Sequence, residues 1–165
     1  MTVYPMTEKM ITTRYHSPIG VITLVSDGES LTELRLPKPQ DNTITETEDP
    51  HNNLPVFEET CRWLDLYFSG KNPDFTPPIK PQGSLFQQVV WRELLAIPYG
   101  QTTTYGVIAK RLNCRSAQAV GQAIHRNPIA IIIPCHRVIG SDGSLTGYAA
   151  GLGLKLKLLA IEKSR

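Results

Sequence analysis

The stretch NPIAIIIPCHRV, residues 127–138, contains the longest uninterrupted aliphatic run of the chain, Ile129 to Ile133. A continuous apolar run of this length is typical of a strand buried on both faces, so we expect a strand-like element in the core of a domain. The run leads directly into PCHR, residues 134–137. Cys135 therefore leaves an apolar element beside an imidazole and a guanidinium, neighbours that favour the thiolate a nucleophile requires. A cysteine without such neighbours is more often a small apolar core residue.

A helix is predicted over residues 84–95, upstream of this stretch. Ser84 can cap its first turn, and the sequence PYG at residues 98–100 ends it. Apolar residues at helical spacing predict which face of the helix is buried. This face comprises Phe86, Val89, Val90, Leu94 and Leu95.

Two short helices are predicted over residues 104–112 and 116–125. One of the two threonines at 103–104 can cap the first helix, and a tight connection leads to the second. This is the outline of a helix-turn-helix motif, although many helical hairpins never touch DNA. The second helix is rich in alanine and glycine, which permit close approach of a backbone to a groove, and Arg115 and Arg126 flank it.

The N-terminal half is predicted to contain a hairpin and one helix. Residues 16–36 alternate apolar and polar side chains around Asp27-Gly28, which is typical of a β-hairpin. Residues 37–53 are polar and acidic and predict an exposed loop. Residues 54–68 have the spacing of a helix that ends before Gly70. Its apolar face comprises Phe57, Cys61, Leu64 and Phe68.

Charge and proline content divide the chain near residues 80–82. The sequence NPDFTPPIKPQG, residues 72–83, contains four prolines and predicts an extended linker between a domain of residues 1–80 and a domain of residues 81–165. The first part carries a net charge of −5 and the second +7, which together give the +2 of the chain. A basic C-terminal part is expected if it meets a polyanion, although small neighbouring domains often differ in charge without such a partner.

Length and composition exclude several classes of protein. A chain of 165 residues can form one large domain or two small ones, and its aliphatic run is too short to cross a bilayer. The first fourteen residues lack the basic start and the apolar stretch of a secretion signal. Three cysteines are too few for a disulfide framework and favour the reducing cytoplasm. Since Cys61 and His16 do not supply four ligands, we expect no metal and no cofactor.

The motif PCHRVIG, residues 134–140, together with the residues around it, resembles the O6-alkylguanine-DNA alkyltransferases, also called methylated-DNA–protein-cysteine methyltransferases. NPIAIIIP precedes the motif, GSLTGYAAGLGLKLKLLAIE follows it, and the block IPYGQTTTYG lies upstream. The resemblance is clear over residues 83–163 and looser in HSPIGVITLV of the first half. It implies an α+β fold, with an N-terminal ribonuclease-H-like antiparallel sheet domain and a mainly helical C-terminal domain that contains the helix-turn-helix. It also implies direct-reversal DNA repair, the irreversible, stoichiometric transfer of an alkyl group from guanine O6 to Cys135.

The resemblance further implies a role for each residue that matches a family motif. Cys135 would accept the alkyl group, His136 would take the thiol proton through a water, and Glu162 would orient and stabilise that imidazole. Asn127 would structure the turn between the second short helix and the cysteine. The substrate pocket is implied at Tyr105, Val138, Tyr148, Ala149 and Ala150. The DNA contacts are implied at Thr104, Arg115, Ala117, Gln118, Ala119, Gly121 and Arg126.

Three of these residues have simpler interpretations when the resemblance is set aside. Glu162 is then a solvated helix residue, Tyr148 an ordinary core side chain, and Asn127 a helix C-cap before a proline. Only their spacing from Cys135 in the family pattern assigns them to the site.

The sequence departs from the family pattern at two places. Gln118 stands where the family usually has an arginine that enters the base stack and fills the space of the flipped nucleotide. Glutamine keeps a planar amide but lacks the charge, and Arg115 lies close enough in sequence to compensate in part. Ala149-Ala150 stand where Ser or Gly is usual, so one hydrogen bond to the purine is expected to be missing.

The expected partner is double-stranded DNA that carries O6-alkylguanine, bound by a monomer with no membrane association. Two rival functions remain open. A DNA-binding lesion sensor without transferase activity would lack the cysteine that this chain has at position 135. A thiol hydrolase would use Cys135 and His136, but it would need an oxyanion hole, for which no motif is evident. The resemblance leaves O4-alkylthymine open as a substrate beside O6-alkylguanine.

Overall fold

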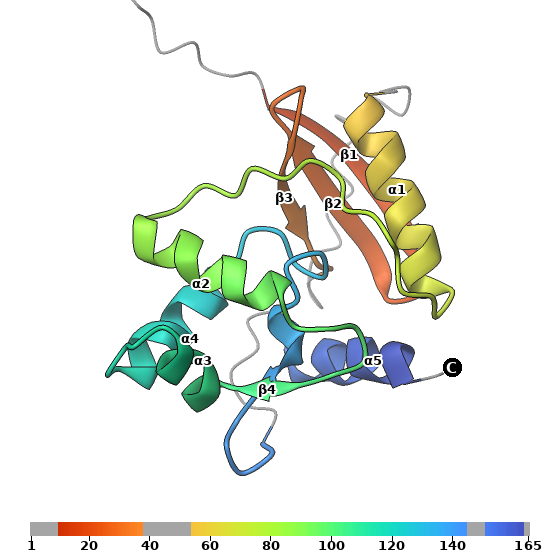
Figure 1. Ribbon diagram of the computed structural model, residues 1–165. Helices are drawn as coiled ribbons and strands as arrows, with labels where there is room; N and C mark the ends of the chain where they lie inside the picture. Colours follow the sequence, from red (N-terminus) through yellow and green to blue (C-terminus); the bar gives the residue numbers. More distant parts are fainter. Residues whose placement is uncertain (1–9, 38–53, 145–150, 164–165) are drawn as a thin grey trace, which may run out of the picture.

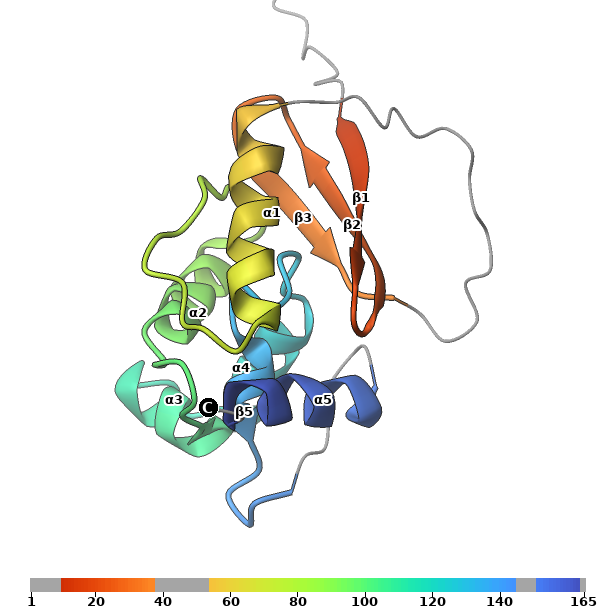
Figure 2. The same ribbon diagram turned by 90° about the vertical axis from the view of Figure 1, so that its right-hand side faces the viewer.

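The computed structural model describes residues 10–37, 54–144 and 151–163, and it begins with a three-stranded antiparallel sheet. The strands β1 (Ile11–Ser17), β2 (Gly20–Ser26) and β3 (Leu31–Arg35) lie in chain order, and helix α1 (Pro55–Phe68) covers one face of the sheet (Figures 1 and 2). The hairpin predicted around Asp27-Gly28 is confirmed as β2 and β3. The earlier turn at Pro18, which separates β1 from β2, was not predicted from the sequence.

Helix α1 is confirmed, but its buried face is broader than the predicted one. Phe57 and Leu64 lie in the core as expected, whereas Cys61 and Phe68 are only half-buried. Because both the sheet and the C-terminal half contact α1, side chains on either side of the predicted apolar face are buried as well. These additional buried side chains are Val56, Thr60, Trp63 and Tyr67.

The segment of residues 72–83, predicted as an extended linker, is paired with the sheet over part of its length. It forms no helix, but its backbone lies beside β3. The Leu31 N–H donates to the Pro78 carbonyl at 2.8 Å, and the Lys80 N–H donates to the Leu31 carbonyl at 2.8 Å. Proline favours the extended conformation that such pairing needs, and the segment is thereby fixed to the sheet.

The C-terminal half is mainly helical, as expected. It contains α2 (Leu85–Leu95), α3 (Tyr105–Arg111), α4 (Ala117–His125) and α5 (Leu152–Lys163). Two short parallel strands, β4 (Thr103–Thr104) and β5 (Val138–Ile139), connect the start of α3 to the segment after Cys135. Figures 1 and 2 place α5 beyond the C-terminal end of α1. Among the helices that these residues form, none is long and apolar enough to cross a membrane.

Helix α2 begins at the predicted cap, and its buried face matches the predicted one only in part. Ser84 accepts a hydrogen bond from the Gln87 N–H, and the Gln87 side chain accepts one from the Ser84 N–H, which makes a capping box. Trp91, absent from the predicted face, is buried and donates its indole N–H to the Ala123 carbonyl of α4 at 2.8 Å. Val90 and Leu94, both on the predicted face, are buried together with Trp91. The predicted core residues Phe86, Val89 and Leu95 are exposed, with 39%, 42% and 43% of their surface accessible.

The two short helices are confirmed as α3 and α4. Thr104 caps α3 by accepting from the Val107 N–H, and Ser116 caps α4 by accepting from the Ala119 N–H, each at 3.1 Å. In the connection, Asn113 has a φ of 52°, a conformation that asparagine tolerates better than most side chains. The pair packs closely, as a helix-turn-helix requires.

The aliphatic run is buried as predicted, but the prediction of a strand is wrong. The run touches β3 at one bridge, between Leu34 and Ile129, and then turns back on itself. The Ile133 N–H donates to the Ile129 carbonyl at 3.1 Å, and Ile131 adopts a φ of 69°. A β-branched residue in this region costs about 1–3 kcal/mol, so the surroundings must hold the turn in place. Periodicity cannot distinguish such a buried turn from a strand.

Candidate active site

Cys135 begins a single turn of 3-10 helix, Cys135–Arg137, at the end of this strained turn. Asn127 clamps the turn from both sides. Its Nδ2 donates to the Ile133 carbonyl at 2.7 Å, and its Oδ1 accepts from the Ile129 N–H at 3.0 Å. Cys135 retains 8% of its surface accessible, so the sulfur is largely shielded from solvent. The clamp fixes the backbone that presents the thiol.

His136 is fully buried directly after the cysteine. Its Nε2 lies 2.5 Å from Oε2 of Glu162, and an ionised carboxylate can only accept, so Nε2 carries the proton. Within the part of the chain that the structure describes, Nδ1 has no hydrogen-bond partner. Burial lowers the pKa of His136, and the positive charges of Arg137 and Lys155 add to this, while Glu162 opposes it. The ring is therefore neutral, with an available lone pair on Nδ1.

The Glu162 carboxylate is buried and receives four hydrogen bonds from the described residues. Oε1 accepts from Nε of Arg137 at 2.8 Å and from the Gly100 N–H at 3.0 Å. Oε2 accepts from His136 and from the Tyr67 hydroxyl, the latter at 2.7 Å. Burial by itself raises the pKa of Glu162, but the hydrogen bonds from His136 and Arg137, together with the positive charge of Arg137, outweigh it and lower that pKa to about 2. The simpler interpretation of Glu162 as a solvated residue is thus wrong.

Lys155 is a second cation beside the thiol. It lies on α5, is fully buried, and donates from Nζ to the Val138 carbonyl at 2.6 Å. Burial lowers its pKa, and the nearby Cys135 opposes that shift. An ammonium in this place favours a thiolate over a thiol at Cys135.

The predicted substrate-pocket residues are only partly described. Tyr105 begins α3, and burial together with the proximity of Cys135 raises the pKa of its hydroxyl. Its ring lies against Gly121 of α4, where a Cβ in place of the glycine hydrogen would lie 3.8 Å from Cδ1 of the ring. Val138 is buried in β5. Tyr148, Ala149 and Ala150 lie outside the described residues.

The predicted DNA contacts gather on the helix-turn-helix. Arg115, Ala117 and Gln118 are exposed around the start of α4, and Arg126 is exposed at its end. Thr104, Ala119 and Gly121 are half-buried, Thr104 as the α3 cap. Small side chains and two arginines thus lie on or beside α4. The DNA contact of each of these residues remains a prediction.

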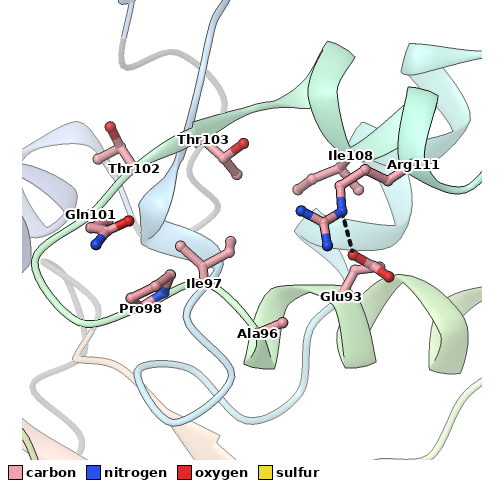
Figure 3. Close-up of a pocket in the computed structure, with 9 residues that line it drawn as sticks. All are labelled: Glu93, Ala96, Ile97, Pro98, Gln101, Thr102, Thr103, Ile108 and Arg111. Atoms are coloured by element: carbon pink, nitrogen blue, oxygen red, sulfur yellow. Dashed lines mark ion pairs between the residues drawn. The ribbon is translucent and has the colours of Figure 1, made fainter.

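A hollow elsewhere in the C-terminal half contains none of the predicted site residues. It lies between the end of α2, the following loop and α3, and an ion pair of 3.3 Å between Glu93 and Arg111 crosses its rim (Figure 3). Its other walls include Ile97, Gln101 and Thr103 (Figure 3). No group of three or more His, Cys, Asp or Glu side chains that could hold a metal ion occurs among the described residues.

Four groups at the thiol site were not predicted from the sequence. They are Tyr67, the Gly100 N–H, the Arg137–Glu162 ion pair and Lys155. Arg137 stands in the quoted PCHR motif, so its position could have suggested a partner. Lys155 lies in a helix with many leucines and lysines, where a lysine normally faces solvent. Tyr67 belongs to the other half of the chain, and no local pattern connects it to Cys135.

The fold and the site together define a class of protein. Its members have a nucleophilic thiol beside a His–Glu pair, and a helix-turn-helix in the same basic half of the chain. Comparison with known sequences makes this specific. The chain belongs to the 6-O-methylguanine DNA methyltransferase family, whose DNA-binding domain matches residues 85–164 and whose ribonuclease-like domain matches residues 10–81.

Similar proteins cover nearly the whole chain. A methylated-DNA–protein-cysteine methyltransferase of Methanosarcina acetivorans is 46% identical over 151 residues, which are 91% of this chain and 96% of the relative. One of Haemophilus influenzae is 43% identical over 155 residues, 92% of this chain and 85% of the relative. The crystal structure of Mycobacterium tuberculosis OGT in complex with DNA superimposes with a TM-score of 0.80 at 44% identity, covering 93% of this chain and 92% of that one. The predicted family and the α+β fold class are confirmed.

Proposed function

We propose that this protein repairs alkylated DNA by moving the alkyl group from guanine O6 to Sγ of Cys135. The state of the buried His136 supports the roles of Cys135 as nucleophile and His136 as base. Its Nε2–H is fixed by Glu162, and its Nδ1 has no partner among the described residues. A neutral imidazole in this state is a base adjacent to a thiol. Family membership supplies the alkyl donor, since the relatives are methylated-DNA–protein-cysteine methyltransferases.

The transfer balances with the groups in the site. The thiol proton of Cys135 passes to Nδ1 of His136 through a water, and the ionised Glu162 stabilises the imidazolium that forms. The sulfur electron pair forms an S–C bond to the alkyl carbon as the C–O6 bond breaks. Guanine leaves with the electron pair of that bond and takes up one proton from water, while the His136 imidazolium returns the thiol proton to water. Tyr105 donates a hydrogen bond toward the purine N3 as the negative charge develops. The product is a stable thioether, so each molecule reacts once.

Two cations favour the thiolate during this step. Lys155 lies close enough to Cys135 for the two to affect each other's ionisation, and Arg137 neutralises Glu162. Because Arg137 carries the charge opposite Glu162, His136 can remain neutral until it takes the thiol proton. The His136–Glu162 pair therefore acts as a base in the resting protein. His136 does not form a permanent imidazolium–thiolate ion pair with Cys135.

We further propose that the partner is duplex DNA carrying O6-alkylguanine, contacted by α3 and α4. The structure of a relative in complex with DNA supports DNA binding, and the +7 charge of residues 81–165 suits a polyanion. O4-alkylthymine is a second candidate substrate. The monomeric state, the cytoplasmic location and the domain boundary near residue 80 remain predictions.

One experiment separates this function from its rivals. The protein is mixed with an oligonucleotide that contains O6-methylguanine, and the intact protein is weighed by mass spectrometry. A stoichiometric gain of one methyl group, located on the peptide that contains Cys135, supports transfer. Turnover without a gain in mass would indicate a thiol hydrolase, and binding without reaction would indicate a lesion sensor.

A further inference from the structure

Tyr67 belongs to the N-terminal half, yet its hydroxyl lies in the thiol site. It is fully buried on the last turn of α1, and its hydroxyl donates to Oε2 of Glu162 at 2.7 Å. The same oxygen lies 3.4 Å from Nε2 of His136. Figure 2 shows how the end of α1 that carries this residue meets α5, the helix that carries Glu162.

The ring of Tyr67 is held from several sides. Trp63 stacks on it with centroids 5.4 Å apart, and Tyr99 and Phe68 meet it edge-on. The His136 ring stands at 80° to it, with centroids 6.4 Å apart. A ring confined in this way keeps its hydroxyl in one place. The contact with Glu162 is therefore a fixed part of the site.

The hydroxyl completes the set of donors around the carboxylate. An ionised carboxylate has about four lone-pair positions, and Glu162 fills them with Arg137, Gly100, His136 and Tyr67. Three of the donors come from the C-terminal half, and Tyr67 alone comes from the N-terminal half. Loss of this donor leaves His136 as the one described partner of Oε2. A buried carboxylate oxygen with fewer donors interacts more strongly with those that remain.

We propose that Tyr67 is a positioning residue for alkyl transfer, through which the N-terminal half sets the proton affinity of His136 by sharing Oε2 of Glu162. This rests on the proposed function, in which His136 takes the thiol proton. The hydroxyl draws electron density from Oε2 and so limits how strongly that oxygen stabilises an imidazolium. His136 consequently stays unprotonated, and able to accept a proton, down to a lower pH.

Among the described residues, the other charged and titratable groups around His136 come from the 3-10 turn, from α5 and from the loop after α2. Arg137 and Cys135 lie on the same 3-10 turn, Lys155 and Glu162 face the ring from α5, and Tyr99 packs against Tyr67 from the loop after α2. Of these groups, only Glu162 loses a hydrogen-bond donor when the Tyr67 hydroxyl is removed. A change in the titration of His136 in that variant is thus assigned to the hydroxyl.

The test compares Tyr67→Phe with Tyr15→Phe. The Tyr15 hydroxyl also donates to a carboxylate on α1, that of Asp65 at 2.5 Å, and not to Glu162. Single-turnover rates with the free base O6-benzylguanine are measured between pH 5 and pH 9, since this probe requires no DNA binding. In Tyr67→Phe, the acid limb of the profile should move up by about one pH unit, which equals about 1.4 kcal/mol, within the range of one hydrogen bond to a charged group. The rate at the acid end then falls about tenfold, whereas the alkaline rate stays close to that of the wild type.

Tyr15→Phe should leave the profile unmoved. A uniform loss of rate at every pH in Tyr67→Phe would mean that the tyrosine only supports the fold, and the proposal would be overturned. The same shift in both variants would overturn it as well. If Tyr67→Phe does not fold, 3-fluorotyrosine placed at position 67 keeps the ring and makes a stronger donor, so the acid limb should move down.

Histidine NMR keeps this inference separate from the proposed function. The pH titration of the His136 ring is followed in labelled protein, with the resonance assigned by a His136→Gln variant. If no protein reacts with O6-benzylguanine, the proposed alkyl transfer is overturned. A higher titration midpoint of His136 in Tyr67→Phe supports the role of Tyr67 even in that case. An unchanged midpoint would overturn the role of Tyr67 whatever the reaction rates are.

Discussion

The reactivity of Cys135 depends on its neighbours, because a free thiol is only a few per cent thiolate near neutral pH. We expect Cys135→Ser to abolish alkyl transfer and leave DNA binding largely intact, since a hydroxyl is nearly isosteric but a far weaker nucleophile. Mass spectrometry measures the transfer, and a gel-shift titration measures the binding. Cys61→Ser and Cys114→Ser are the matched controls, because both thiols are free and half-buried away from the site. Methyl gain by the Cys135→Ser protein would show that another residue is the acceptor.

Glu162 links the site to the stability of the fold. Its pKa is lowered from 4.5 to about 2 in the folded protein, so ionised Glu162 stabilises the fold at pH values above 4.5. That stabilisation is lost progressively as the pH falls from 4.5 toward 2, where the folded protein also binds the proton. In urea unfolding, the wild type should exceed Glu162→Gln in free energy of unfolding at pH 6, and the difference should shrink as the pH approaches 2. A difference that is constant over this range would contradict the low pKa.

The residues of the site could be predicted from the sequence only where a motif names them. Cys135 and His136 are adjacent in PCHR, and the spacing of the family pattern assigns Glu162 and Asn127. Burial gives these residues their chemistry, and it depends on contacts between distant parts of the chain. Lys155 illustrates the difference, because nothing near it in the sequence indicates that its ammonium is enclosed beside Val138.

Among the secondary-structure elements, the presence of the helices could be predicted from the sequence, but the face that each helix buries could be predicted only in part. The predicted cap at Ser84 forms, and Thr104 is the one of the two candidate threonines that caps α3, because such caps are local hydrogen bonds. The buried face of α2 was predicted only in part, at Val90 and Leu94, because the packing of Trp91 against α4 was not visible in the apolar pattern. The aliphatic run was assigned to a strand because its apolar pattern fits one, while the clamp by Asn127 that bends it is not visible in that pattern.

Helix α4 carries the departure at Gln118, which is exposed near the start of the helix. If base extrusion is limited by the missing arginine, Gln118→Arg should speed repair of O6-methylguanine in duplex DNA and leave the rate with free O6-benzylguanine unchanged. An added stabilisation of about 1.4 kcal/mol in the flipped state gives roughly a tenfold gain, provided that flipping precedes a slower chemical step. Stopped-flow or quenched single-turnover rates on both substrates check this.

Gln122→Arg is the charge-matched control for that comparison, because Gln122 is an exposed residue one turn further along α4. It adds the same charge without placing it at the finger position, so the duplex rate should rise only with Gln118→Arg. Equal duplex rates for the wild type and Gln118→Arg would mean that Gln118 already performs this function. A parallel change on both substrates would indicate an altered thiol site.

The whole molecule joins an acidic N-terminal half to a basic C-terminal half, and the structure shows that the two are not independent. The segment of residues 72–83 is tied to β3, and Tyr67 of α1 completes the hydrogen bonds of Glu162 on α5. The sequence of each half shows its net charge, and it predicted strands with one helix in the first half and mainly helices in the second. Their contact depends on side chains far apart in the chain and was not predictable from either half.

The distribution of charge predicts how DNA binding responds to salt. Phosphate contacts release counterions, so the logarithm of the binding constant should fall linearly with the logarithm of the salt concentration, by about 0.9 for each phosphate neutralised. Fluorescence anisotropy with a lesion-free duplex, measured between low and physiological salt, gives this slope without alkyl transfer. Arg115→Ala should reduce the slope by about one, because Arg115 is exposed beside the start of α4. Lys71→Ala removes the same charge from an exposed position after α1 and should leave the slope unchanged. A flat dependence in the wild type, or equal losses in both variants, would contradict a phosphate contact centred on the helix-turn-helix.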